Sequence, residues 1–162
     1  MIKIDRDGLL LCELQANTFE ISLQYTGSSS DIFIRRFMNS KVAKSLDNRE
    51  ILQTNIQPKD ILERIEEQYG HSEYGSVRYS ENELYWIGFL YRYFSYTYAL
   101  SSVQVYKIVK PKELREVFLA YHTMDTSQAI ERILEAKNLL LNDNEELNRQ
   151  YEIFKKIRKE NP

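Results

Sequence analysis

Apolar residues recur at spacings of three and four along most of the chain, which is the repeat of one face of an α-helix. The stripes predict helices over residues 9–23, 30–46, 58–69, 103–109, 111–121, 125–136 and 145–160. Ser30 or Asp31 is the expected N-cap of the second helix, Pro58 suits a first helical turn, and Gly70 suits a C-terminus. No segment favours a strand. The predicted fold class is all-α, a single compact bundle of about seven helices.

An aromatic run forms the centre of the chain, with eight aromatic side chains between Tyr85 and Tyr98. Ser80 and Glu83 form a capping box, so the helix is expected to begin near residue 81. Apolar residues point in every direction around it, which predicts a buried central helix. Gly88 lies in its middle, where glycine lowers helix propensity, and this predicts the close approach of another helix.

Two other interpretations of the aromatic run are disfavoured. A membrane-spanning helix needs about 20 apolar residues, and this run is shorter and contains Arg92. A stacking platform for bases would place exposed aromatic rings among cations on a sheet or groove. Residues 70–79 follow no repeat and contain two glycines, which predicts an ordered surface loop.

The domain organisation predicted from the pattern is a helical core domain over 1–142 and a C-terminal amphipathic helix over 143–162. One apolar stripe runs along the last helix, formed by Leu147, Tyr151, Phe154 and Ile157. Such a stripe needs an apolar surface to pack against, either on its own domain or on a partner. These side chains are therefore candidate partner-binding residues.

Composition limits the functional classes. The 162 residues include 22 Lys and Arg against 24 Asp and Glu, so no overall positive field would draw the chain to nucleic acid. Cys12 is the single cysteine, which excludes an intramolecular disulfide and a cysteine-based zinc site. The short leucine run near the start lacks the features of a signal peptide, so a cytoplasmic location is expected.

A pair of arginines on the predicted second helix suggests contacts with a ligand or partner. Arg35 and Arg36 are adjacent on a predicted helix and point to different sides, so one of them could pair with Glu66 or Glu67. Either arginine could instead form part of a partner-binding site.

The segment 101–123 has the outline of a helix-turn-helix. Lys107, Lys110 and Lys112 give it a local basic patch, together with Arg115 and Arg92. A patch of this kind could contact the phosphates of operator DNA. Its turn lacks the usual glycine, and helix pairs with surface lysines also occur in proteins that bind no DNA.

Arg115 and His122 match the R-x(4–6)-H spacing of the HEPN class of bacterial ribonucleases, which are also all-helical. In that class the two side chains meet at a dimer interface and serve acid-base chemistry on RNA. The residue after the arginine is usually Asn, Asp or His and is Glu116 here. The alternative is that His122 packs near a helix end. The pattern predicts no metal site and no cofactor.

Four segments resemble, in this order, a family of small, uncharacterised bacterial proteins: "SDIFIRRFMNSKVAKSLD" (30–47), "IEEQYG" (65–70), "YGSVRYSENELYWIGFLYRYFSYT" (74–97) and "AYHTMD" (120–125). The resemblance covers roughly 8–136. Members of that family are encoded in short operons, often beside a small domain similar to ADP-ribosyltransferases. The resemblance implies an antitoxin or accessory role at a toxin-antitoxin or phage-defence locus.

The resulting hypothesis is a non-enzymatic cytoplasmic protein that binds and neutralises a toxin encoded next to it, without a membrane anchor. A HEPN-like ribonuclease and a DNA-binding autorepressor are the alternatives. The absence of a convincing catalytic constellation favours the first reading over the ribonuclease.

Overall fold

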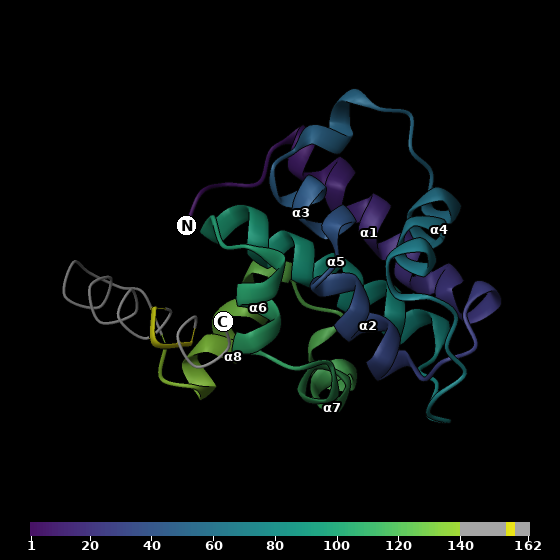
Figure 1. Cartoon of the computed structure of the whole chain (residues 1–162). Helices are drawn as coiled ribbons and strands as arrows, with labels where there is room; N and C mark the ends of the chain where they lie inside the picture. The colour runs from purple at the N-terminus through teal and green to yellow at the C-terminus, as the bar shows by residue number, and fades with distance from the viewer. Residues whose placement is uncertain (140–154, 158–162) are drawn as a thin grey trace.

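The fold is all-α, as the apolar spacing predicts (Figure 1). A computed structural model describes residues 1–139 and 155–157. The helices in chain order are α1 (Arg6–Tyr25), α2 (Ser30–Met38), α3 (Lys41–Asp47), the 3-10 helix η1 (Glu50–Gln53), α4 (Pro58–Tyr69), α5 (Glu81–Tyr98), α6 (Ser102–Ile108), α7 (Pro111–Tyr121) and α8 (Thr126–Ala136). Within these residues the chain forms a compact helical bundle, which confirms the predicted fold class.

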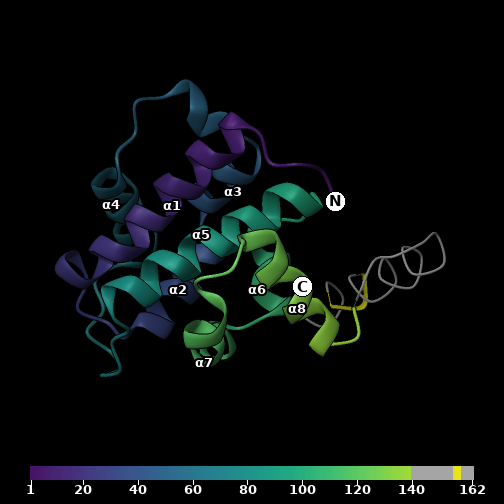
Figure 2. The same cartoon turned by 180° about the vertical axis from the view of Figure 1, so that it is seen from behind.

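Helices α1 and α5 lie side by side along most of their length and form the centre of the bundle (Figure 2). Gly88 permits this contact. A Cβ at that position would lie 3.0 Å from Ala16 Cα, 3.0 Å from the Gln15 carbonyl oxygen and 2.8 Å from Phe19 Cγ. The Gln15 side chain donates to the Gly88 carbonyl at 3.0 Å. The predicted close approach at this glycine is therefore confirmed.

The other helices pack around the α1–α5 pair. Helix α4 packs against α1, and α2 and α3 join it to the rest of the bundle. Helices α6, α7 and α8 each contact α5. Aliphatic and aromatic side chains from all of these helices form the core, with one residue each from η1 (Ile51) and α7 (Leu114). The others include Leu11, Phe33, Phe37, Leu84, Leu90, Phe94, Val105, Ile130 and Leu134.

Local side-chain hydrogen bonds fix where the helices begin and end. The Ser80–Glu83 capping box opens α5 as predicted. The expectation of one helix over 30–46 is wrong, because Ser40 ends the first segment and starts the next. Its hydroxyl donates to the Phe37 carbonyl at 2.6 Å and accepts from Ala43 N–H at 3.1 Å. The N-cap of α2 is also one residue earlier than predicted.

The N-cap of α2 is Ser29, whose hydroxyl accepts from Ile32 N–H at 3.3 Å. Ser30 is already helical, and its hydroxyl accepts instead from the Tyr79 N–H at 2.9 Å. Ser29 therefore caps the helix, and Ser30 holds the loop at 70–79. That loop also pairs with the start of α2 through the carbonyls of Tyr74 and Val77.

The buried central helix is confirmed for one side of α5 and corrected for the other. Leu84, Ile87, Leu90, Tyr91 and Phe94 are buried. A second set of aromatic residues on the same helix is only half-buried, namely Tyr85, Trp86, Phe89, Tyr93 and Tyr98. The aromatic residues of α5 are therefore divided between a face that packs in the core and a face at the surface.

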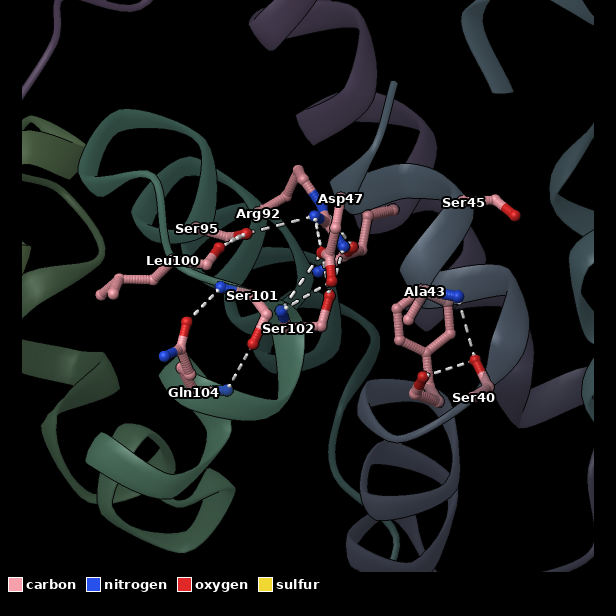
Figure 3. A network of polar contacts seen from close by, with 12 residues as sticks. Ser40, Ala43, Ser45, Asp47, Arg92, Ser95, Leu100, Ser101, Ser102 and Gln104 are labelled. Atoms are coloured by element: carbon pink, nitrogen blue, oxygen red, sulfur yellow. Dashed lines mark hydrogen bonds and ion pairs between the residues drawn. The ribbon is translucent and has the colours of Figure 1, made fainter. Parts of the chain in front are cut away.

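Arg92 is the one buried arginine in the part of the chain that the structure describes, with 1% of its surface exposed. Figure 3 shows it at the centre of a network of polar contacts. Its Nε donates to Gln15 Oε1 at 2.8 Å, its Nη1 to Asp47 Oδ1 at 2.7 Å and its Nη2 to Ser102 Oγ at 2.7 Å. The prediction that Arg92 contributes to a surface basic patch is wrong. Through these hydrogen bonds, Arg92 of α5 connects its helix to α1, α3 and α6.

Candidate functional site: an aromatic groove between α5 and α7

Helix α7 packs beside the first half of α5 (Figure 2). A groove with a volume of about 610 Å³ lies between these two helices. Its lining is mostly aromatic and comes from three helices: Glu20 of α1, Asn82, Tyr85, Trp86 and Phe89 of α5, and Phe118, Leu119 and His122 of α7. Pockets of this size and composition are typical of binding sites.

The floor of the groove belongs to a ladder of rings along α5, formed by Tyr85, Phe89 and Tyr93. Tyr85 and Phe89 are stacked with their ring centroids 6.4 Å apart, and Phe89 and Tyr93 with theirs 6.3 Å apart. Residues spaced by four lie on one helical face, so the ladder follows from the sequence spacing. All three rings are half-buried, and each therefore keeps part of its surface open to solvent.

Helix α7 supplies the opposite wall. Phe118 meets Trp86 edge-on at 5.7 Å and stacks against the His122 ring at 4.4 Å. His122 is held by a contact of 2.7 Å between its Nδ1 and the Phe118 carbonyl. Leu119 stands beside this cluster with 84% of its surface exposed. An exposed leucine bordered by aromatic rings is a typical feature of a protein-binding surface.

Acidic side chains from α1 border the ladder. Glu20 lines the groove, and none of the eight lining residues is Lys or Arg. Burial, followed by the negative charges of Glu13 and Glu20, raises the pKa of the Tyr85 phenol. Farther along the ladder, burial and the carboxylate of Asp125 raise the pKa of Tyr93. Carboxylates thus lie near both tyrosines of the ladder, Glu13 and Glu20 near Tyr85 and Asp125 near Tyr93.

Arg115 and His122, the pair suggested by the ribonuclease spacing, have different local roles. Arg115 Nε donates to Glu83 at 3.1 Å, and its guanidinium lies 4.5 Å from the centre of the Tyr79 ring. Tyr79 in turn donates to Asp31. Arg115 thus joins α7 to the start of α5, whereas His122 borders the aromatic groove. Their catalytic role stays a prediction.

The two arginines of α2 are both away from the core. Arg35 is exposed, and Arg36 Nη1 donates to the Gly70 carbonyl at 2.7 Å. The Arg36 guanidinium also lies 5.4 Å from the centre of the Tyr69 ring. Arg36 thus contacts a carbonyl and a ring at the end of α4 and not the carboxylate of Glu66 or Glu67 that the sequence suggested. A role in partner binding is untested for both.

The predicted basic helix pair exists as α6 and α7, joined by Val109 and Lys110. Lys110 Nζ lies 4.2 Å from the centre of the Tyr106 ring, and burial lowers the pKa of this lysine. Lys112 is exposed, and Lys107 is half-exposed. Operator binding through these lysines stays a prediction, now without Arg92.

Three residues of the C-terminal apolar stripe, Leu147, Tyr151 and Phe154, lie outside the described residues. Ile157 is described, is half-buried and packs against the hydrophobic core. In residues 1–139 and 155–157, no three His, Cys, Asp or Glu side chains gather as metal ligands would. Across the same residues, no helix combines the length and apolar character that crossing a membrane requires.

The groove was not predicted from the sequence, although one signal for it was present. Tyr85, Phe89 and Tyr93 recur every four residues, and α7 carries Phe118 and His122 at the same spacing. These two repeats mark surface stripes on two helices, but their meeting depends on how α7 packs against α5. No protein-family model, no curated protein and no solved structure matches this chain.

Proposed function

We propose that this chain is a non-enzymatic protein that binds and neutralises a partner toxin encoded beside it, and that the α5–α7 aromatic groove is its contact surface. The observation that carries the proposal is the half-buried ladder of Tyr85, Phe89 and Tyr93, bordered by the exposed Leu119. Aromatic residues in such positions dominate the binding energy of many protein interfaces. The antitoxin role comes from the family resemblance, and the surface comes from the geometry.

The energetics favour occupation of this groove by a macromolecule. Burying a leucine side chain contributes about 1.5–3 kcal/mol, and Leu119 is almost entirely unburied in the free chain. The rings are already held in place by contacts with one another, as in the Trp86–Phe118 and Phe118–His122 pairs. A partner would therefore meet a preorganised surface, which lowers the entropic cost of binding.

The test is co-expression of the tagged chain with the product of the adjacent gene, followed by pull-down, size-exclusion chromatography and a growth assay. The wild-type chain is expected to form a stable complex and to rescue growth. Leu119→Glu is expected to abolish both, because it places a charge in the centre of the interface. Tyr74→Glu is the matched control, since Tyr74 is 79% exposed on the loop at 70–79 and lies outside the groove lining.

A chain truncated after Asn142 separates the groove from the C-terminal stripe in the same assay. Retained binding by a truncated chain with an unchanged melting temperature would assign the contact to the groove. A complex that forms equally well with Leu119→Glu would contradict the groove as contact surface. Growth arrest by this chain alone, relieved by His122→Ala, would instead support the ribonuclease alternative.

A further inference from the structure

We infer that the groove takes a helical segment of the partner that presents arginine or lysine side chains among apolar ones. This inference rests on the proposed function, since it names the chemistry of the partner at the same surface. It is carried by half-buried aromatic rings beside an acidic side chain and by a groove lining in which none of the described residues is Lys or Arg.

Carboxylates give one border of the groove a negative charge. Glu20 lines the groove, and Glu13 lies on the same helix close enough to act on the Tyr85 phenol. The nearest arginine on α7, Arg115, is already paired with Glu83 at 3.1 Å. Among the described residues neither Glu13 nor Glu20 forms an ion pair, so the negative charge at the groove attracts a cationic segment and repels an acidic one.

Aromatic rings themselves favour a cationic partner. The face of an aromatic ring carries negative charge density and binds ammonium and guanidinium groups. The chain already uses this interaction elsewhere: Arg49 lies 4.4 Å from the centre of the Tyr96 ring, and Lys59 lies 5.6 Å from the centre of the Tyr25 ring. In the groove, the rings of the ladder contact one another and are only half-buried, so part of each ring stays available to a cation from outside.

The spacing of the rings suits a helical partner. The rings of the ladder repeat every 6.3–6.4 Å along α5. An α-helix rises about 5.4 Å per turn, so cations at i and i+4 on a partner helix would match successive gaps of the ladder. The volume of about 610 Å³ accommodates several side chains of such a helix. Leu119 would then contact the apolar residues between the cations.

Trp86 makes the test direct, because it is the single tryptophan of the chain and lies in the groove. The probe is a helical peptide of about 15 residues with leucines and arginines at i, i+4 spacing on one face. A matched peptide carries citrulline, which is neutral and of nearly the same shape, at each arginine position. Binding is followed by Trp86 fluorescence and by calorimetry with the full chain.

The arginine peptide is expected to shift Trp86 emission and to bind roughly tenfold more tightly than the citrulline peptide. Glu13→Gln combined with Glu20→Gln is expected to remove most of that difference. The control is Glu63→Gln combined with Glu67→Gln, at exposed positions of α4. Equal affinity for the two peptides, or no binding of either, would overturn the inference.

The toxin complex separates this inference from the proposed function. If Leu119→Glu abolishes the complex but the Glu13→Gln, Glu20→Gln chain binds as the wild type does, the groove is the contact surface and the cationic partner is refuted. If neither change weakens the complex, the proposed function of the groove fails as well. If both changes weaken the complex, the proposed function and the cationic partner are both supported.

Discussion

Arg92 Nη1 donates to Asp47 Oδ1 at 2.7 Å, and this ion pair joins the middle of α5 to the end of α3 (Figure 3). Asp47 also accepts from the Ser102 backbone N–H at 3.0 Å and from the Ser102 hydroxyl at 2.6 Å, so one carboxylate both neutralises Arg92 and satisfies the start of α6. Arg92 is 1% exposed and Asp47 is 14% exposed. Water therefore cannot replace a missing partner easily.

Removal of the Asp47 carboxylate should therefore destabilise the fold. Asp47→Ala is expected to lower the free energy of unfolding by about 3–5 kcal/mol, because it leaves a buried guanidinium without its counter-charge. Arg92→Met should cost less, because the Asp47 carboxylate that it leaves is 14% exposed and still accepts from the Ser102 N–H and hydroxyl. Urea denaturation measures both, with Lys44→Ala on the exposed side of α3 as control. A loss below 1 kcal/mol for Asp47→Ala would show that the pair contributes little.

Gly88 provides a second stability prediction. Alanine normally favours a helix by about 1 kcal/mol over glycine, so Gly88→Ala would stabilise an isolated α5. Here the added Cβ would meet the backbone of α1 at 3.0 Å, and overpacking of this kind costs about 1–3 kcal/mol. We expect a net loss of stability and a lower melting temperature. Asn17→Ala, at an exposed position of α1, is the control and should change little.

Sequence reasoning succeeded where the determinant is local. The Ser80–Glu83 capping box, Pro58 in a first helical turn and the glycine at 88 each involve residues whose chemistry allows few alternatives. It failed at Ser40, because a single serine in an otherwise helical pattern is compatible with a continuous helix as well as with a break. Which of the two forms depends on the packing of α3 against its neighbours.

The candidate site could likewise be predicted only in part from the sequence. The density of aromatic residues was visible, but the sequence could not reveal that Tyr85 and Phe89 face solvent while Tyr91 faces the core. That assignment depends on the position of α7 beside α5. Arg92 was misplaced for a related reason: a lone arginine among aromatic residues carries no sign of the distant Asp47 that makes its burial possible.

The pH dependence of stability is expected to follow the carboxylates at helix starts. Burial alone would raise the pKa of Glu83, but the Ser80 N–H and the Arg115 guanidinium outweigh it and hold the pKa below its usual 4.5. The unfolded chain then binds more protons than the folded one as the pH falls through 4.5, so stability present above that pH is progressively lost. Three further helix-capping carboxylates also have lowered pKa values, namely Asp5, Glu113 and Asp125.

Thermal unfolding between neutral pH and about pH 3 measures this effect. Glu83→Gln is expected to lower the stability by about 1 kcal/mol at neutral pH and by much less at acidic pH, because protonation has already weakened the wild-type contact there. Glu81→Gln is the matched control on the same helical turn. An identical deficit at both pH values would mean that the charge of Glu83 does not contribute.

Arg78 is expected to hold the loop at 70–79 against the end of α1. Its Nη1 donates to the Thr26 carbonyl at 3.0 Å and to the Ser28 carbonyl at 3.3 Å, and its Nη2 donates to the Leu23 carbonyl. The Leu23 carbonyl lies in the last turn of α1, where carbonyls lack helical partners. One planar guanidinium therefore joins the loop to both the helix and the turn that follows it.

Arg78→Ala should remove this connection while leaving the backbone pairing of Tyr74 and Val77 with the start of α2. We expect faster hydrogen exchange at the amides of 70–79 and a loss of about 1 kcal/mol in global stability. Arg78→Lys should restore only part of the protection, because an ammonium group cannot span three carbonyls in the way a guanidinium does. The exposed Arg64 of α4 provides the control, Arg64→Ala. If exchange in the loop is unchanged in Arg78→Ala, the backbone pairs alone are sufficient to hold it.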